Sequence, residues 1–335
     1  MKSLGFAMLC PAGLENVVSA AAQAEYSALM VESVSSGFLS GTVEAALSDL
    51  RRFPCATNVF NVIGRCPRSS IDAELANLAT ILAAASNVRL AASPSRSTFR
   101  LRIHDDGRFS PLRQLNTRRL TGELARRSGF DFCPASGRTE FWLIRRREQA
   151  DVVLATKLSA KKPMPERGVL RPEICAAMAA LSRVRDMQLV LDPFAGSGAL
   201  GVACARAGAR QVWINDSDPD CVAIDNVPKS LRDRVRATHF DFRQLDVDPH
   251  SICAVVTDPP WGRINDPSEG LEVLYDDFGR MARTWLAGAG TLTVLSGAPA
   301  TAIDAMLNAG AFSEAERISI LVNGAKASII SASAS

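Results

Sequence analysis

The stretch VLDPFAGSGALG, residues 190–201, joins an apolar run ending in an acid to a glycine-rich turn and then to a helical pattern. Gly196 and Gly198 allow a tight turn in which backbone amides can approach a ligand closely. Because any turn from a strand to a helix tolerates glycine, the turn alone does not indicate a binding site. The order of strand, turn and helix predicts the first unit of an α/β sheet.

The chain from residue 188 onward repeats this alternation. Short apolar runs such as QLVLDP, QVWIND and ICAVVTD are separated by helical patterns such as DCVAIDNVPKSL, residues 220–231, and LEVLYDDFGRMARTWL. Such runs are typical of a parallel sheet covered by helices on both faces. Near the end, Asn323-Gly324 lies between two β-rich runs, and this hairpin signal predicts an antiparallel terminal strand.

Three acids end three consecutive predicted strands. Asp192 closes the first strand, Asp216 follows the second and Asp241 follows the third. Asp216 is placed to accept hydrogen bonds from ribose hydroxyls, and Asp241 to accept from an adenine amino group. Each acid alone also fits a solvated strand end or a helix cap. Together, at the edge where open α/β sheets bind ligands, they favour a binding site.

The stretch TDPPWG, residues 257–262, follows the apolar run SICAVV. Two prolines cannot donate hydrogen bonds to a neighbouring strand, so they end the strand abruptly between an acid and a tryptophan.

Two other chemistries fit this half less well. Methylation of pyrimidine C5 needs a cysteine nucleophile, and Cys55 of the Pro-Cys pair lies far outside it. A dehydrogenase leaves DPPW unexplained and would more naturally show GxGxxG.

The first half of the chain mixes strands and helices. Residues 1–92 fit a ferredoxin-like α+β unit, and residues 93–160 predict a second unit with a basic helix around LNTRRLTGELARRSG. Residues 161–187 are expected to form a linker and a lead-in helix. Residues 188–335 are expected to form the catalytic domain.

Charge separates these parts. Residues 1–90 hold 6 basic and 7 acidic side chains, residues 91–170 hold 17 and 8, and residues 171–335 hold 15 and 20. The basic middle indicates a polyanionic partner, most simply nucleic acid. The alternative is that a GC-rich genome supplies the many arginines and alanines. The candidate RNA contacts are Arg118, Arg119, Arg126 and Arg127 on a predicted helix, and Arg145, Arg146 and Arg147 on a predicted strand or hairpin.

Composition excludes several classes of protein. No stretch reaches the roughly 20 apolar residues that cross a bilayer. Pro11, Gly13 and Glu15 interrupt the apolar start, which argues against a signal peptide. A cytoplasmic protein is therefore expected. The eight cysteines form no CxxC pair and only three histidines are present. Neither a disulfide framework nor a metal site is predicted.

VLDPFAGSG, IND at residues 214–216 and TDPPWG, in that order, resemble the class I S-adenosylmethionine-dependent methyltransferases that act on exocyclic amines of nucleobases. The whole chain resembles the THUMP-domain RNA methyltransferases that make N2-methylguanosine. FAMLCPAGLENVV, VESVSSG, the basic region 95–158 and the lead-in GVLRPE carry that likeness. Relatives usually have tyrosine or phenylalanine after the prolines, and Trp261 departs from that form.

The resemblance implies a Rossmann-like methyltransferase sheet preceded by a ferredoxin-like and THUMP-type region. It also implies S-adenosylmethionine as the cofactor and structured RNA, expected to be tRNA, as the partner. The implied cofactor contacts are Asp192, Phe194, Ala195, Gly196, Gly198, Asp216, Asp241 and Asp258. The implied catalytic residues are Asp258, Pro259, Pro260 and Trp261.

The implied chemistry explains the residue types in DPPW. An amine on guanine or adenine is a poor nucleophile because its lone pair is delocalised into the ring. Acceptors at the amine, Asp258 and the carbonyl beside Pro259, favour a geometry in which the lone pair points at the methyl group. Trp261 offers an extruded base a stacking face worth about 1–3 kcal/mol.

Three alternatives stay open from sequence. They are methylation of guanine N2 in ribosomal RNA, methylation of adenine N6 in nucleic acid, and a pseudoenzyme that binds RNA without methylating it. Intact Asp192, Asp216 and Asp258 favour an enzyme. The nucleotide position, the number of methyl groups added and the oligomeric state are not fixed by the sequence.

Overall fold

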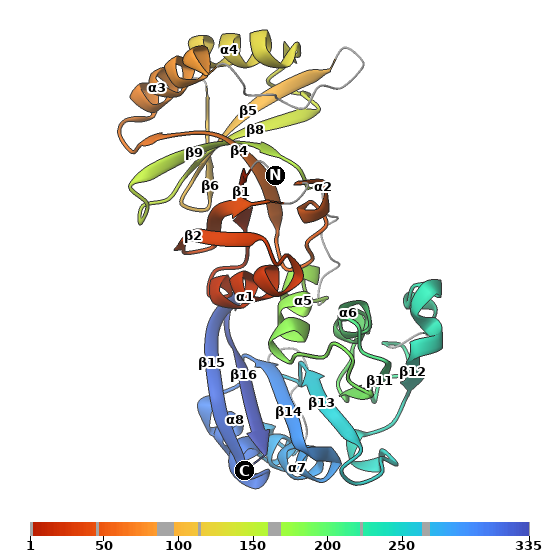
Figure 1. The fold of residues 1–335 in the computed structure, drawn as a ribbon. Helices are drawn as coiled ribbons and strands as arrows, with labels where there is room; N and C mark the ends of the chain where they lie inside the picture. Colours follow the sequence, from red (N-terminus) through yellow and green to blue (C-terminus); the bar gives the residue numbers. More distant parts are fainter. Residues whose placement is uncertain are drawn as a thin grey trace. The chain divides into compact units, whose positions relative to one another are not determined.

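The structure is a computed structural model, and it describes residues 3–44, 47–85, 97–112, 115–159, 169–221, 224–262 and 269–334. The chain forms two compact units, Met1–Lys162 and Pro163–Ser335. Figure 1 shows the elements of each unit. The predicted boundary at residue 92 and the first part of the predicted linker lie outside the described residues. No helix within the described ranges is long and apolar enough to span a membrane.

The first unit is built on one nine-stranded sheet. Its main path runs β2-β3-β1-β4-β9-β8-β5-β6, and the short β7 pairs with β5. The strands therefore come from both of the expected amino-terminal parts. The elements are β1 (Leu4–Leu9), α1 (Glu15–Glu25), β2 (Leu29–Ser35), β3 (Phe38–Val43), α2 (Leu47–Leu50), β4 (Asn58–Pro67), α3 (Ile71–Ala84), β5 (Thr98–Asp105), β6 (Arg108–Ser110), α4 (Arg118–Ser128), β7 (Asp131–Phe132), β8 (Thr139–Arg145) and β9 (Asp151–Lys157).

Alternation along the strands gives this sheet two apolar faces. Phe141 and Leu143 of β8 belong to a core that includes leucines of α3 and α4. Trp142, between them in sequence, lies in a second cluster with Phe38 and Phe60. Successive side chains of a strand point to opposite faces, so one strand supplies both cores.

The second unit is a seven-stranded sheet in the order β12-β11-β10-β13-β14-β16-β15. Pairs from β12 to β14 are parallel, whereas β16 is antiparallel to both of its neighbours. The elements are α5 (Pro172–Leu181), β10 (Leu189–Asp192), α6 (Ala199–Ala207), β11 (Gln211–Asn215), η1 (Ile224–Asn226), η2 (Lys229–Arg234), β12 (Val235–Thr238), η3 (Phe242–Gln244), β13 (Ile252–Thr257), α7 (Leu271–Trp285), β14 (Leu286–Ser296), α8 (Ala300–Ala309), β15 (Phe312–Val322) and β16 (Ala325–Ala334).

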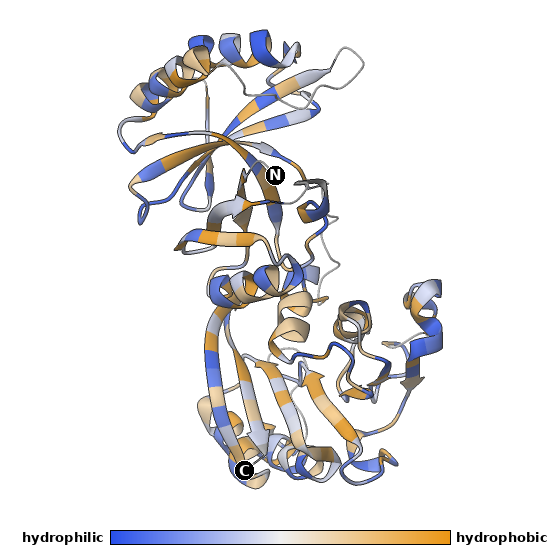
Figure 2. Cartoon of the chain, viewed as in Figure 1, coloured by the Kyte–Doolittle hydropathy of each residue, from blue (hydrophilic) through white to orange (hydrophobic). Residues whose placement is uncertain are grey.

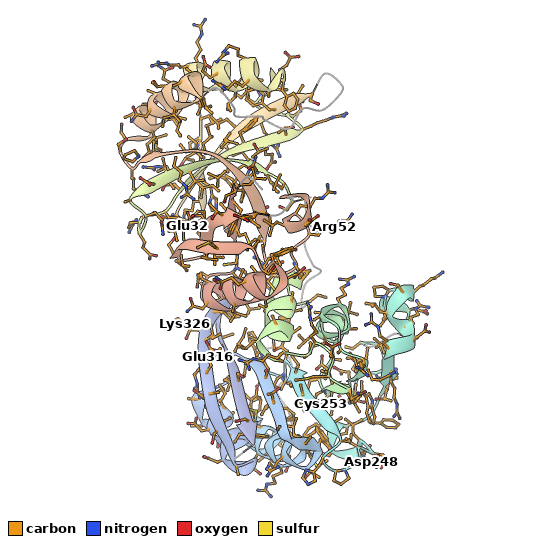
Figure 3. The ribbon with its side chains drawn as sticks, in the orientation of Figure 1. Glu32, Arg52, Asp248, Cys253, Glu316 and Lys326 are labelled. Carbon is orange, nitrogen blue, oxygen red and sulfur yellow. The ribbon has the colours of Figure 1, made fainter. Side chains whose placement is uncertain are left out.

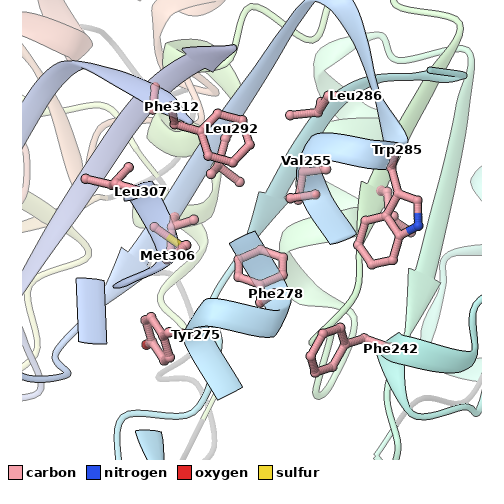
Figure 4. Close-up of a cluster of buried hydrophobic side chains, with 14 of the residues drawn as sticks. Phe242, Val255, Tyr275, Phe278, Trp285, Leu286, Leu292, Met306, Leu307 and Phe312 are labelled. Carbon is pink, nitrogen blue, oxygen red and sulfur yellow. The ribbon is translucent and has the colours of Figure 1, made fainter. Parts of the chain in front are cut away.

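A large apolar cluster packs α7 and α8 against this sheet. Phe278 and Trp285 of α7 and Met306 of α8 lie in it with Val255 and Leu292 of the sheet (Figure 4). In Figure 2 the apolar strands β13 and β14 contrast with the largely hydrophilic α4 of the first unit. The continuous apolar runs of β10 and β13 follow from this burial, because both faces of a central parallel strand are covered.

The predicted hairpin at Asn323-Gly324 is confirmed, since β15 and β16 pair antiparallel on either side of it. The antiparallel strand is inserted between β14 and β15 instead of lying at the edge. The edge strand β15 carries charged side chains, among them Glu316 (Figure 3), which discourage pairing with another chain.

The α-helix predicted over residues 220–231 is wrong within the described residues, because these residues form 3₁₀ turns instead. Two short 3₁₀ segments, η1 and η2, stand there, and residues 222 and 223 lie outside the described residues. Pro228 immediately precedes η2. A proline disfavours the α conformation at the residue before it, which here is Val227, so a continuous α-helix is interrupted at this point.

Gly279 allows the close approach of α7 and α8. A Cβ at this position would lie 2.2 Å from the backbone oxygen of Met306. Gly279→Ala should therefore lower the free energy of unfolding by roughly 1–3 kcal/mol, because the two helices must separate. Equilibrium urea unfolding measures the change.

Gly122, on the exposed face of α4, is the matched control. A Cβ there meets no atom within 4 Å. Gly122→Ala should be neutral or raise stability by about 0.4–1 kcal/mol, because alanine restricts the unfolded chain and favours a helix. Equal effects of the two substitutions would contradict the role given to Gly279.

Candidate active site

The predicted acids gather at one edge of the second sheet. Across that edge the strand order places Asp216 after β11, Asp192 at the end of β10 and Asp258 after β13. Asp241 follows β12 on the outer side of β11. From β10 the chain moves outward through β11 to β12 and then returns to β13 on the other side of β10, so the edge has the topological switch point at which such sheets bind ligands.

Asp192 is almost fully buried between the two central strands. Its Oδ1 accepts a hydrogen bond of 2.6 Å from Thr257 Oγ1 at the end of β13. Burial raises the pKa of Asp192 to about 7, because the charged form loses its hydration, and Asp258 and Asp216 raise it further. The hydrogen bond from Thr257 opposes that shift.

The glycine turn after β10 adopts the geometry expected from sequence. Gly196 and Gly198 have positive φ angles of 50° and 77°, and α6 begins at the next residue. A Cβ at Gly196 would meet no atom within 4 Å, so the turn faces open space. Ala195 donates its backbone N–H to the carbonyl of Asn215, which ties the turn to β11.

Asp216 is joined directly to this turn. Its Oδ2 accepts a 2.8 Å hydrogen bond from the backbone N–H of Gly196, and its Oδ1 accepts one of 3.0 Å from the backbone N–H of Asp218. The sequence predicted both Gly196 and Asp216 as cofactor residues, and the structure brings them into contact.

Asn215 was missed by sequence reasoning and connects three loops of the site. Its side-chain nitrogen donates to the carbonyls of Phe240 and Pro193, at 2.9 and 3.4 Å. Its side-chain oxygen accepts from the Phe240 N–H and the Thr238 hydroxyl, at 3.1 and 2.9 Å. An asparagine inside the apolar run QVWIN was the available signal, because a fully buried amide needs several partners.

Two of the predicted cofactor residues also have structural partners. Asp241 caps η3 and pairs with Arg243 at 3.2 Å. Phe194 packs against Phe242 and Phe278, with ring centroids 5.0 and 5.2 Å apart. Their contacts to a cofactor remain proposals.

Phe240, next to Asp241, is half exposed at the same edge. Sequence reasoning did not single it out. Asn215 binds both the N–H and the carbonyl of Phe240, so the backbone of this residue is held at the site.

The DPPW loop brings its acid and its ring together. The indole Nε1 of Trp261 donates to Asp258 Oδ1 at 2.8 Å. Burial raises the pKa of Asp258 to about 7, and this hydrogen bond from Trp261 lowers it. Tyr275, Ser296 and Gly297, which sequence reasoning also missed, lie behind the loop. Their sequence positions carry no local signal, since tertiary packing alone brings them to it.

The arginines predicted to bind RNA separate into two groups in the first unit. Arg118, Arg119 and Arg126 are exposed on α4, and Arg126 pairs with Glu123 at 2.7 Å. Arg127 donates to the carbonyl of Ala83 at 3.2 Å. The helix therefore presents several cations to solvent.

The second group requires a correction. Arg145 is buried and pairs with Glu74, at 2.8 Å, and with Asp105. Arg146 is also buried, with its guanidinium 5.7 Å from the ring centre of Phe38. Only Arg147 of the three is exposed, and it lies 3.6 Å from Asp106. Arg145 is the last residue of β8 and Arg146 follows it, and both point to tertiary partners that a count of charges along the sequence does not reveal.

No group of three or more histidine, cysteine, aspartate or glutamate side chains within the described ranges is arranged to hold a metal ion. All eight cysteines are free thiols.

Comparison with known proteins supports the chemistry of this half. Residues 160–320 match the family described as "RMKL-like, methyltransferase domain". A curated relative from Methanothermobacter thermautotrophicus, named tRNA (guanine(10)-N2)-dimethyltransferase, is 30% identical over 39% of this chain and 40% of its own length. One from Thermus thermophilus, named tRNA (guanine(6)-N2)-methyltransferase, is 31% identical over 40% of this chain and 41% of its own. The matches thus span about two fifths of these relatives.

Solved structures share the fold over the whole chain. TrmN from Thermus thermophilus superposes with a TM-score of 0.79 at 21% identity, covering 99% of this chain and 100% of that one. A possible methylase from Clostridium difficile 630 has a TM-score of 0.74 at 11% identity, covering 100% of this chain and 99% of its own. The predicted fold class, a Rossmann-like methyltransferase sheet preceded by an α+β region, is confirmed.

Asn215→Ala should lower the free energy of unfolding by roughly 1–3 kcal/mol, since Phe240 and Pro193 lose buried hydrogen-bond partners. The exposed Asn116→Ala should stay within about 0.5 kcal/mol. Urea unfolding of both variants tests the difference. A neutral Asn215→Ala would show that water replaces the amide and that the three loops do not depend on it.

Proposed function

We propose that this protein is an S-adenosylmethionine-dependent methyltransferase that modifies guanine N2 in tRNA. The observation that carries the proposal is the DPPW loop, in which Asp258 and Trp261 are joined by a hydrogen bond at the carboxyl edge of the sheet. The match of residues 160–320 to a methyltransferase domain and the names of the curated relatives support it.

The cofactor side of the site is formed by the loops after β10, β11 and β12. S-adenosylmethionine, when bound, supplies a methyl group on a positively charged sulfur. The open turn at Gly196 leaves room for a ligand to approach the backbone. Asp216, which holds that turn, accepts the ribose hydroxyls, and Asp241 accepts from the adenine amine. The half-exposed Phe240 offers its ring to the adenine as part of this proposal.

The base side is formed by the loop after β13. Trp261 stacks on the extruded guanine, and the Asp258 carboxylate and the Pro259 carbonyl accept the two N–H groups of the amine. With S-adenosylmethionine bound, these acceptors would direct the lone pair on N2 at the methyl carbon, and the new N–C bond would form as the C–S bond breaks and leaves its electron pair on sulfur. Asp258 stabilises the positive charge that develops on N2. The proton leaves N2 for Asp258 or water.

The first unit is proposed to bind the RNA. Arg118, Arg119 and Arg126 on α4 and Arg147 after β8 are the exposed arginines of the predicted set, and they are suited to phosphates. The same proposal includes a THUMP-type character for residues 93–160. It also includes a cytoplasmic location, which suits a tRNA substrate. The division into units at residues 92, 160 and 187 also remains a proposal.

Incubating the purified chain with tRNA and S-adenosylmethionine should produce N2-methylguanosine, measured by mass spectrometry of the nucleosides. Asp258→Ala should lose on the order of 10²–10³ in turnover, because a charge-stabilising acceptor is removed. Asp258→Asn should lose less, since its amide oxygen still accepts a hydrogen bond. Methyladenosine as the product would replace guanine with the adenine N6 alternative, and no methylated base would favour the pseudoenzyme.

Activity should rise with pH through about 7. Below its pKa of about 7 Asp258 is protonated and stops acting as a charged acceptor, so kcat/KM should fall about tenfold per pH unit. The pKa of Asp192 lies near the same value, so a wild-type limb steeper than tenfold per pH unit would report both carboxylates. Asp258→Asn should flatten the limb. An unchanged limb in that variant would assign the titration to Asp192.

S-adenosylmethionine at 100 times its Kd should stabilise the protein by about 2.7 kcal/mol, seen as a higher melting temperature. Asp216→Ala should abolish most of that shift, because the ribose acceptor and the hydrogen bond to Gly196 are both lost. The exposed Asp248→Ala (Asp248 is labelled in Figure 3) should keep the full shift. Stabilisation by a nicotinamide cofactor instead would contradict the proposal.

A further inference from the structure

The carbonyl that closes the proline pair is held from behind by α7. Tyr275 is fully buried, and its hydroxyl donates to the Pro260 carbonyl at 3.1 Å. The same hydroxyl oxygen lies 2.7 Å from Ser296 Oγ, which in turn accepts from the backbone N–H of Ala298 at 3.0 Å. With the Ser296 hydroxyl donating to the Tyr275 hydroxyl oxygen, both hydroxyl groups of this hydrogen-bond network have a donor and an acceptor partner. Such a satisfied buried network specifies one geometry of the loop.

The indole of Trp261 rests against the backbone of Gly297. A Cβ at Gly297 would lie 2.4 Å from Trp261 Cε3 and 2.9 Å from Cδ2 and Cζ3, distances that real Cβ atoms do not adopt. Any larger residue at 297 would have to displace the ring. Since Gly297 directly follows Ser296, the end of β14 supplies both the polar and the steric contact to the loop.

These contacts reach the acceptor through the indole. Trp261 donates to Asp258 Oδ1 at 2.8 Å, so the position of the ring determines one hydrogen bond of the carboxylate. A phenylalanine or tyrosine ring has no N–H at that place. Tyr275 and Ser296 thus hold the Pro260 carbonyl, which belongs to the peptide that leads into Trp261, and Gly297 lies against the indole that donates to Asp258.

We propose that Tyr275, Ser296 and Gly297 are positioning residues for methyl transfer: the first two hold the Pro260 carbonyl next to Trp261, Gly297 supports the indole, and together they fix the direction of the Asp258 acceptor. The inference rests on the proposed function, since it assigns these residues to the base side of the same site. None of the three is required to touch the base.

Tyr275→Phe tests the proposal, and Tyr26→Phe is its matched control. Tyr26 also donates its hydroxyl to a backbone carbonyl, that of Asp49 at 3.2 Å, but in the first unit. Tyr275→Phe should lower kcat for tRNA methylation by roughly 10- to 100-fold, the range expected from a small misplacement of a reacting group. The KM for S-adenosylmethionine should stay within about twofold of the wild type, because the cofactor loops are untouched. Tyr26→Phe should leave both constants unchanged.

A spectroscopic readout separates failure of this inference from failure of the proposed function. The Trp261 indole N–H signal in ¹⁵N NMR is assigned by its loss in Trp261→Phe, among the four tryptophans of the chain. Tyr275→Phe should shift or broaden that signal, and Tyr26→Phe should not. This result is expected even if the wild type methylates no RNA, in which case the proposed function fails and the positioning contacts stand.

Gly297→Ala provides a second, steric test. The added methyl group should displace the indole, lower kcat and lower the melting temperature. Trp261→Phe in the Gly297→Ala background should restore much of the melting temperature, because the smaller ring relieves the clash. The inference is overturned if Tyr275→Phe keeps wild-type kcat and an unchanged indole signal. It is also overturned if its activity falls only in step with cofactor binding and melting temperature.

Discussion

The hydrogen bond between Thr257 and Asp192 joins the two central strands of the catalytic unit at their carboxyl ends. A buried carboxylate without such a partner would cost several kcal/mol, so this bond makes an acid tolerable inside an otherwise apolar sheet. The strand order reverses at this pair, so the loops that follow β10 and β13 diverge above it. The glycine turn follows Asp192 and the DPPW loop follows Thr257. The hydrogen bond between these two residues therefore fixes the distance between the starts of the two loops.

The sequence predicted the catalytic sheet because its signals are local. Apolar runs, glycine turns and Asn323-Gly324 act over a few residues, and those elements appear where they were expected. The acids Asp192, Asp216 and Asp258 could be placed together because parallel strands end at one edge. The helix expected near Pro228 does not form for a local reason as well, since proline disfavours the α conformation at Val227.

The rest of the site depends on contacts between residues far apart in sequence. Tyr275 and Gly297 carry no pattern that links them to the prolines, because α7 and the end of β14 meet the loop only in the folded chain. The arginines show the same limit. Composition correctly marked residues 91–170 as basic, but Arg145 lies in a buried pair with Glu74, where it joins β8 to α3. Charge counts identify a basic region without showing which cations reach solvent.

The insertion of β16 between β14 and β15 has a consequence for biosynthesis. Strands β10 to β14 can pair as they leave the ribosome, but β14 has no neighbour on its outer side until residues 325–334 have been made. During that interval an apolar strand offers a free edge to other nascent chains. The short turn at Asn323-Gly324 lets β16 fold back on β15 as one hairpin. Hairpin closure takes about 1–10 μs, so the length of the interval is set by the synthesis of the last strand and not by its folding.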